Sequence, residues 1–362
     1  MKKIILFALT TTLLLACIQS NKGVGVVSNS LTIKNTRLIH DTIGFAQYAW
    51  QLDSIVDRIS PSDKKETGTT FKAAISPHDD YAYAGGLYHK TLQNIKAKTV
   101  ILVGVAHGAS IFNLQDKIIL GSFTEWDCAY GPIKVSPLRD SLVANLKKES
   151  FVVHNDMMEL EHSLEAITPF LQKFNPEVEI VPMLVPYMKF TDMELFSEDL
   201  ASVLASEMKK QNLSYGEDVA IVISNDAIHY GSTGWGGKDL APFDVDLDGN
   251  QQAHDKDMKI IVECLVGTLS SKRVKTFTEY TVMPEDYKEY NWTWCGRYST
   301  PFGLLTANKL NEKLHGEALN GSLIGYRSSI KDPHIQVKDI GMGHTAPALP
   351  THWVAYVGMG YN

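Results

Sequence analysis

The sequence predicts an α/β domain in which helices cover both faces of a mostly parallel sheet, a three-layer α/β/α architecture. First, short apolar runs rich in β-branched residues recur along the chain, as strands buried on both faces require. Second, longer segments with helical spacing of apolar residues lie between these runs. The runs that predict strands are Ala73–Ser76, Thr99–Val105, Val178–Val185 and Val219–Ser224.

The alternation of strands with helices favours parallel pairing, because each helix carries the chain back to the starting edge of the sheet. Pro169 is expected to kink the helix that contains it. Two late apolar runs, Ser322–Ser328 and Trp353–Gly358, are expected to join an edge of the sheet antiparallel. The predicted helices are Ile43–Ile59, Leu87–Lys98, Pro137–Lys148, Ser163–Phe174, Asp192–Gln211, Gln251–Leu269 and Pro301–Leu314.

The composition is that of an ordinary globular protein. Of 362 residues, 44% are hydrophobic and 21% charged, with 34 basic against 41 acidic side chains. This balance disfavours nucleic acid as a partner, since such binding calls for a strongly basic surface. No repeat and no Pro/Gly/Ser-rich linker follows Leu31, so we expect a single domain over residues 39–362.

The N-terminal segment has the pattern of a bacterial lipoprotein signal. Lys2 and Lys3 precede the apolar run Ile4–Ala16, which is too short to span a bilayer, and the run leads into Cys17 as a lipobox does. We expect a signal peptide over residues 1–16, acylation of Cys17 and a flexible tether over residues 17–38. The protein would then sit in the cell envelope, with the lipid bilayer as a partner. The alternative is an ordinary secretory signal cleaved elsewhere.

Residues suited to chemistry follow the predicted strands directly. In open α/β sheets ligands bind at the carboxyl ends of the strands, so these residues are expected to meet in one crevice. Imidazole and thiolate suit zinc, copper and iron, and two histidines with one carboxylate suit non-haem iron. The residues are His78, Asp79 and Asp80 after the first strand, His107 after the second, Asp226 and His229 after the fourth, and Cys295 with Arg297 before the last helix.

Each of these residues also has a purely structural interpretation. His78 could cap a turn, His107 could satisfy backbone carbonyls, and Asp226 could begin a short helical turn. Convergence of all of them on one crevice favours the functional interpretation.

The cysteines leave a choice open. Cys295 lies near the start of a helix, where the dipole would favour a thiolate, but in an oxidising compartment it could instead form a disulfide with Cys128. Cys264 lies on the apolar face of a predicted helix and is expected to be an inert buried thiol.

A further polar cluster surrounds Ser163. Ser163 has the pattern of an N-cap with Glu165 in the first turn, which accounts for part of the cluster. Glu161 and His162 remain, and we expect them to orient a ligand imidazole or to accept a proton.

Together these motifs resemble the Memo family, whose bacterial members are commonly called AmmeMemoRadiSam system protein B. The resemblance runs from about Thr42 to Gly360 and is specific because the motifs keep their order and spacing. The motifs are Pro77–Tyr81, Val105–Gly108, Glu161–Glu165 with Pro169–Leu171, Ser224–Asp226 with His229–Gly231, and Cys295–Arg297.

The resemblance implies a fold similar to the class III extradiol dioxygenases, in which the crevice holds non-haem iron. It implies that His78, His107 and Cys295 bind the metal, with Asp226 and His229 lining the same pocket. Iron or copper is the metal it suggests, while zinc is an alternative from the donor types. The implied activity is redox chemistry on oxygen species, although eukaryotic members are also known for peptide binding.

The sequence departs from the family pattern at two places. Asp79 and Asp80 stand where the family usually has Ala-Gly, and these added carboxylates are expected to strengthen cation binding or to replace a ligand. Val105 and Ala106 precede His107 where the family usually has Pro-Ser.

Two other motifs are weaker than they look. Asp244, Asp246 and Asp248 match part of an EF-hand calcium loop, but the entering helix and the final glutamate are missing, and Asp248 could simply cap the next helix. The glycine-rich segment 231–238 lacks the spacing of a P-loop, so no nucleotide partner is expected. We expect that segment to form a flexible rim of the pocket.

These observations favour a metal-dependent redox or oxygenase-type enzyme at the cell envelope, using iron or copper. Asp226 or His229 would handle protons, and Glu161 with His162 would orient them. One alternative is a non-catalytic surface protein that binds peptide, glycan or a metal for transfer. Another is a hydrolase in which metal-bound water attacks an ester or amide. The ligand would be a small molecule or a peptide.

Overall fold

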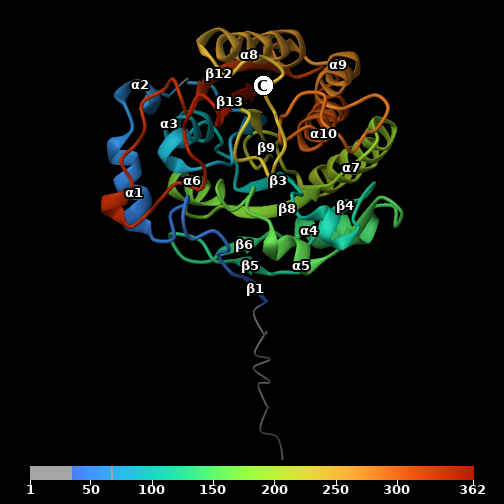
Figure 1. The fold of residues 1–362 in the computed structure, drawn as a ribbon. Helices are drawn as coiled ribbons and strands as arrows, with labels where there is room; N and C mark the ends of the chain where they lie inside the picture. The colour runs from blue at the N-terminus through green and yellow to red at the C-terminus, as the bar shows by residue number, and fades with distance from the viewer. Residues whose placement is uncertain (1–34, 67) are drawn as a thin grey trace, which may run out of the picture. The chain divides into compact units, whose positions relative to one another are not determined.

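The parallel centre of the sheet forms where the buried apolar runs predict it. The computed structural model (Figure 1) describes residues 35–66 and 68–362. Strands lie in the order β8-β3-β9-β2, and each neighbouring pair is parallel. The predicted α/β class with a mostly parallel sheet is therefore confirmed. Their bounds are β2 (Ala73–Ser76), β3 (Thr99–Val105), β8 (Glu179–Val185) and β9 (Val219–Ser224).

The late strands extend this centre antiparallel, as predicted. β13 (Trp353–Tyr361) pairs antiparallel with β2 on one side and with β12 (Asn320–Ser328) on the other. β11 (Gly267–Thr268) pairs with β12, and β10 (Asp226–Tyr230) pairs with β13. β10 was not predicted as a strand, although it carries two of the expected site residues.

The far side of the sheet consists of very short strands that the sequence does not reveal. Runs of two or three residues are too short to show a period. The strands there are β1 (Thr36–Arg37), β4 (Ile118–Leu120), β5 (Glu125–Trp126), β6 (Ile133–Val135) and β7 (Phe151–Val153).

β1 corrects the predicted end of the tether. Arg37 is fully buried. Its guanidinium forms a buried ion pair with Glu165 and lies 4.6 Å from the ring centroid of Trp126. Residues 35–38 thus belong to the folded part rather than to a tether reaching residue 38, since the amide of Asn35 also donates to the hydroxyl of Thr124. The predicted signal peptide, Cys17 and the rest of the tether lie outside the described residues.

Helices cover both faces of the sheet, which gives the three predicted layers (Figure 1). In β3 the side chains of Ile101 and Val103 pack into one apolar core, and those of Val100 and Leu102 into the other. The first core includes side chains of α4 (Leu138–Asn145), α7 (Phe190–Gln211), α8 (Leu247–Ile260), α9 (Ser271–Thr281) and α10 (Ser299–His315). The second includes those of α1 (Ala49–Arg58), α3 (Tyr81–Leu92), α5 (Asn155–Leu160) and α6 (Thr168–Phe174).

Several helix boundaries differ from the prediction. α3 begins at Tyr81 rather than Leu87, because Gly85 and Gly86 hide its helical pattern. A Cβ on Gly86 would lie 2.6 Å from Arg327 Nη1, so the end of that side chain packs directly against the helix backbone here. α6 begins at Thr168, which places Pro169 in the first turn, where proline starts a helix instead of kinking it. Ser163 is therefore not the N-cap of α6.

α8 also begins earlier than predicted. Asp246, rather than Asp248, is its N-cap, since its side chain accepts a hydrogen bond from the amide of Gly249. The helix ends in a π-helical turn, η2 (Ile261–Leu265), in which Cys264 is buried as expected. α9 and the short α2 (Pro61–Lys64) were not predicted.

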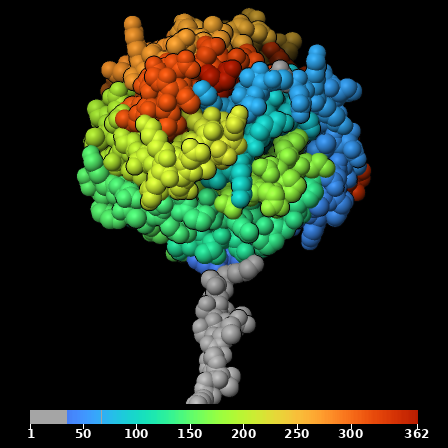
Figure 2. Space-filling model, turned by 180° about the vertical axis from the view of Figure 1, so that it is seen from behind, coloured from blue at the N-terminus to red at the C-terminus, as the bar shows by residue number. Residues whose placement is uncertain are grey.

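Segments from the two ends of the described chain lie side by side. In Figure 2 the blue N-terminal part borders the orange and red C-terminal part. Asp63 of α2 and Arg327 of β12 form an ion pair of 2.6 Å there. Among the described residues, no helix is both long and apolar enough to cross a membrane.

Candidate metal centre

His78 follows β2 and is held with one ring nitrogen free of a proton. Its Nδ1 lies 2.7 Å from the hydroxyl of Ser224, which itself donates to the carbonyl of Ser163. The serine hydroxyl has a single proton, so His78 Nδ1 must donate and Nε2 keeps its lone pair. The His78 amide donates to Asp226 Oδ1 at 2.9 Å, and Nε2 lies 3.3 Å from Asp226 Oδ2.

His107 follows β3 and is oriented by Glu161. The Glu161 carboxylate accepts from the ring Nδ1 of His107 at 2.9 Å and from its backbone amide at 2.7 Å. A third bond comes from the amide of Ser163 at 2.9 Å. Burial raises the pKa of Glu161, but the neighbouring His107 and His162 and these hydrogen bonds outweigh it and hold the pKa well below its ordinary value. The carboxylate is ionised, so it accepts the Nδ1 proton of His107, and Nε2 is the ring nitrogen left to face the crevice.

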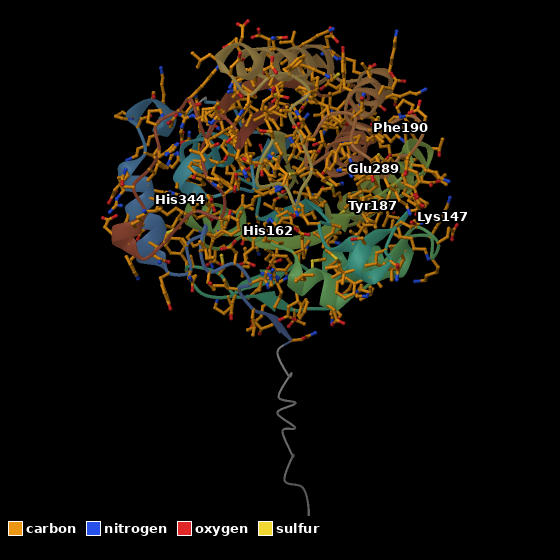
Figure 3. All side chains as sticks on the ribbon, viewed as in Figure 1. Lys147, His162, Tyr187, Phe190, Glu289 and His344 are labelled. Carbon is orange, nitrogen blue, oxygen red and sulfur yellow. The ribbon has the colours of Figure 1, made fainter. Side chains whose placement is uncertain are left out.

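His162 lies against His107 and lines the same crevice, with its ring centroid 6.0 Å from that of His78. His107, Glu161 and His162 form a further group whose ligand atoms lie within 4.8 Å of one another. The rings of His162 and His107 stack with centroids 4.8 Å apart, and His162 Nδ1 is 3.7 Å from Glu161 Oε1. Burial and the nearby His107 lower the pKa of His162, so the ring is neutral at pH 7. Figure 3 shows His162 near the middle of this face of the molecule.

His229 and Asp226 reach the same crevice because β10 is irregular. Residues three apart in a regular strand point to opposite faces, but the pairing of β10 with β13 shifts register between Asp226 and His229. His229 is tied by two bonds to Thr293: its amide donates to the Thr293 carbonyl at 3.1 Å, and the Thr293 hydroxyl donates to the His229 carbonyl at 2.6 Å. Cys295 lies two residues after Thr293, and its Sγ is 3.3 Å from His229 Nε2.

Burial sets the protonation of this group. It raises the pKa of the Cys295 thiol well above its ordinary value, aided by the charges of Asp226 and Asp79. It likewise raises the pKa of Asp226 and lowers that of His229 to about 4. The expectation that the helix start favours a thiolate at Cys295 is not supported, because burial, which raises the pKa of the thiol, is the larger effect.

The side chains meet at a cavity of about 280 Å³. One ligand atom each from His78, His107 and Cys295 can be chosen so that all lie within 4.8 Å of one another. The same holds for Asp226, His229 and Cys295. The cavity is lined by Asp41, Phe45, His78, Asp79, His107, His162, Asp226, His229, Trp235, Cys295, Thr345, Ala346 and Val354.

Comparison with known proteins identifies the family. Residues 46–341 match the model of the family described as Memo-like proteins. The chain belongs to the Memo-like family. A MEMO1 family protein of Pyrococcus horikoshii is 26% identical over 271 residues, covering 72% of this chain and 84% of that relative. A MEMO1 family protein of Thermococcus kodakarensis is 26% identical over 283 residues, covering 75% and 85%. The family resemblance seen in the sequence is confirmed.

The donors of this Memo-like protein fit a transition metal. Two imidazole nitrogens with fixed tautomers and a thiol sulfur form a set that binds iron, copper or zinc, and each fixed imidazole has a hydrogen-bonded partner behind it. Glu161 is such a partner rather than a group facing the cavity.

Asp79 and Asp80 have different roles. Asp79 lines the cavity and accepts from the hydroxyl of Tyr356 at 2.7 Å. Asp80 points away and accepts from the amide and the hydroxyl of Thr345 at 2.7 and 3.1 Å. The expectation of two added carboxylates beside the ligands is therefore wrong for Asp80, which fastens the Thr345 loop to the cavity rim.

Two other sequence interpretations are corrected. Cys128, Cys264 and Cys295 are all free thiols, so the alternative disulfide between Cys128 and Cys295 is not formed. Arg297 does not line the main cavity, but a smaller one next to it.

The calcium interpretation has no support in the geometry. Asp246 is used as a helix cap, and Asp248 lies in the first turn of α8. Within the described ranges, the groups close enough to hold a metal include none of Asp244, Asp246 and Asp248.

Sequence reasoning missed several residues of the site. Asp41, Phe45 and Thr345 line the cavity, yet they lie in irregular segments with no motif. Trp235 was foreseen only as part of the glycine-rich rim; its ring stacks on His352 at 3.9 Å. Such contributions from distant loops carry no signal in spacing.

Proposed function

We propose that this Memo-like protein is a metal-dependent redox or oxygenase-type enzyme. The observation that carries the proposal is the convergence of ligand atoms of His78, His107 and Cys295 within 4.8 Å of one another. A bound iron or copper ion would supply a redox couple and open coordination positions at this point.

The residues around the donors suit proton handling. Burial and, after it, the charge of Asp79 raise the pKa of the Asp226 carboxyl group well above its ordinary value, and its Oδ2 lies 3.3 Å from His78 Nε2. His229 is neutral because burial lowers its pKa to about 4, so it is able to accept a proton. Asp226 is therefore the better general acid and His229 the better general base.

Apolar side chains complete the cavity. Phe45, Trp235 and Val354 line it together with the polar groups, and Phe45 and Val354 are each 3% exposed. These walls limit access of water to reactive species.

Metal analysis tests the proposal. Protein purified without chelator should contain about one transition metal ion per chain, His78→Ala and Cys295→Ser should each lose most of it, and Cys128→Ser should retain it. Cys128 is the matched control because it is a buried free thiol outside the cavity lining. Equal metal content in all four proteins would refute the metal centre.

Oxygen uptake separates enzyme from carrier. Metal-loaded protein should consume oxygen in the presence of a reductant, and His229→Gln should slow this step while keeping the metal. Metal exchange with chelators and no oxygen uptake would favour a binding or transfer protein instead.

We also propose that the protein is anchored in the cell envelope by acylation of Cys17. The support is the order of Lys2, Lys3, the apolar run Ile4–Ala16 and Cys17. In cells fed radiolabelled palmitate, the wild-type protein should be labelled and Cys17→Ser should not. Unlabelled wild-type protein would refute the anchor.

A further inference from the structure

Arg297 is a buried cation with no carboxylate partner. Its side chain is 5% exposed, and among the residues that the structure describes no carboxylate lies within ion-pair distance. One guanidinium nitrogen, Nη2, donates to the carbonyl of Lys288 at 2.9 Å, while Nε is buried without a hydrogen-bond partner. A buried charge normally has a counterion, so this one points to an anion from outside the chain.

Three tyrosine rings hold the guanidinium in place. Its Cζ lies 3.3 Å from the ring centroid of Tyr290, 4.7 Å from that of Tyr298 and 5.8 Å from that of Tyr187. Stacking on aromatic faces stabilises the cation and fixes the plane of its donors without neutralising it. The guanidinium is thus fixed in position for a ligand.

Arg297 lines a second cavity of about 70 Å³ that adjoins the metal donors. His107 and Cys295 line both this cavity and the main one, so an occupant would contact two of the three proposed metal ligands. Tyr187, also in its lining, appears to the right of His162 in Figure 3.

The two cavities differ in charge. Asp41, Asp79 and Asp226 line the main cavity, whereas the lining of the second contains Arg297 and no acidic side chain. A negatively charged group is therefore disfavoured in the first and favoured in the second.

We propose that the Arg297 cavity binds the carboxylate of a small acid and holds that acid beside the metal centre. The volume is about twice the share of one water molecule in the liquid, ~30 Å³, which suits a carboxylate group. The planar fork of the guanidinium matches a carboxylate with two hydrogen bonds. As an assignment of substrate class, this inference rests on the proposed function, while anion binding itself does not.

Binding of ¹³C-labelled formate, followed by NMR titration, tests the proposal on the full folded chain with and without metal. Arg297→Met should weaken formate binding at least tenfold. Arg297→Lys should weaken formate binding less, since lysine keeps the positive charge and loses only the paired donors of the guanidinium. Arg58→Met is the matched control, because Arg58 pairs with Asp339 at 2.7 Å and does not line the cavity. It should bind formate within twofold of wild type.

Formate binding by a folded Arg297→Met variant within twofold of wild type would overturn the proposal. If that variant does not fold, Arg297→Lys decides: wild-type affinity there overturns the proposal and a measurable loss supports it. Metal content is measured in the same samples. Formate binding that depends on Arg297 in a protein that takes up no metal would refute the metal centre and leave the anion site standing.

Discussion

Glu161 holds His107 at two points, the ring Nδ1 at 2.9 Å and the backbone amide at 2.7 Å. This double contact fixes the position of His107 and the proton on its Nδ1. Nε2 is then the ring nitrogen available to bind a metal in the crevice. In the sequence the two residues belong to separate motifs 54 positions apart, and nothing in the spacing indicates that they are in contact.

Replacing Glu161 by Gln should lower metal affinity by roughly 10–100-fold, the usual cost of losing a partner behind a metal ligand. The new amide would place a donor against the amide of His107 or of Ser163, both of which need an acceptor. Affinity is measured by competition with a chelator of known strength. Glu279→Gln, an exposed change on α9, is the control, and equal affinities of the two variants would contradict this role.

Metal binding at pH 7 should release about one proton from Cys295. The pKa of the thiol is raised well above its ordinary value, first by burial, so the metal-free group is protonated, whereas a coordinated thiol is not. Metal affinity should therefore rise about tenfold per pH unit below that pKa. Calorimetry in buffers of different ionisation enthalpy counts the protons. Cys295→Ala should release about one fewer than wild type, and an unchanged count would exclude Cys295 as a ligand.

Gly296→Ala should weaken metal binding without removing a ligand. A Cβ at Gly296 would lie 2.2 Å from Asn225 Oδ1 and 2.6 Å from Asn225 Cβ, so the segment that carries Cys295 must move. We expect a loss of about 1–3 kcal/mol in stability, typical of overpacking, and at least a tenfold loss in metal affinity. Gly325→Ala meets Leu87 Cδ1 at 2.9 Å and is the control for packing strain alone. Metal affinity equal to that of the wild-type protein in Gly296→Ala would show that metal binding does not depend on the exact position of Cys295.

Asp257 should make stability depend on pH. It accepts from the indoles of Trp292 and Trp294 at 2.7 and 2.6 Å, and from the hydroxyl of Tyr326 and the amide of Ile228 at 2.8 and 3.3 Å. It thereby joins the segments that carry His229 and Cys295. Burial raises its pKa to about 6, despite these hydrogen bonds.

The sign follows from the raised pKa. Between about pH 4 and 6 the unfolded chain loses this proton before the folded one, so its contribution to stability falls as pH rises, by about 3 kcal/mol in total. Denaturant unfolding of the wild-type protein and of Asp257→Asn across pH 4–7 measures the free energy of unfolding of each protein at each pH. The stability difference between the two proteins should shrink in this window. A difference that stays constant would show that Asp257 does not titrate there.

Much of the fold was predictable because buried parallel strands leave a strong signal. The segments at β3 and β9 were predicted to the residue, since continuous β-branched runs occur where both faces are covered. Asp226 and His229 were expected after β9, but the strand that carries them was not predicted, because a register shift follows from pairing with β13. The start of α3 was misplaced because Gly85 and Gly86 hide its helical pattern.

The sequence by itself determined the order of strands and helices along the chain and the residue types delivered to the strand ends, His78 and His107 among them. These follow from local periodicity and from the rule that parallel strands end at one edge. Only the tertiary structure decided that Asp79 faces the cavity while Asp80 fastens Thr345, that Glu161 stands behind His107, and that Arg297 lines a separate cavity. Those outcomes depend on side-chain direction and on contacts between distant segments, neither of which leaves a pattern in residue spacing.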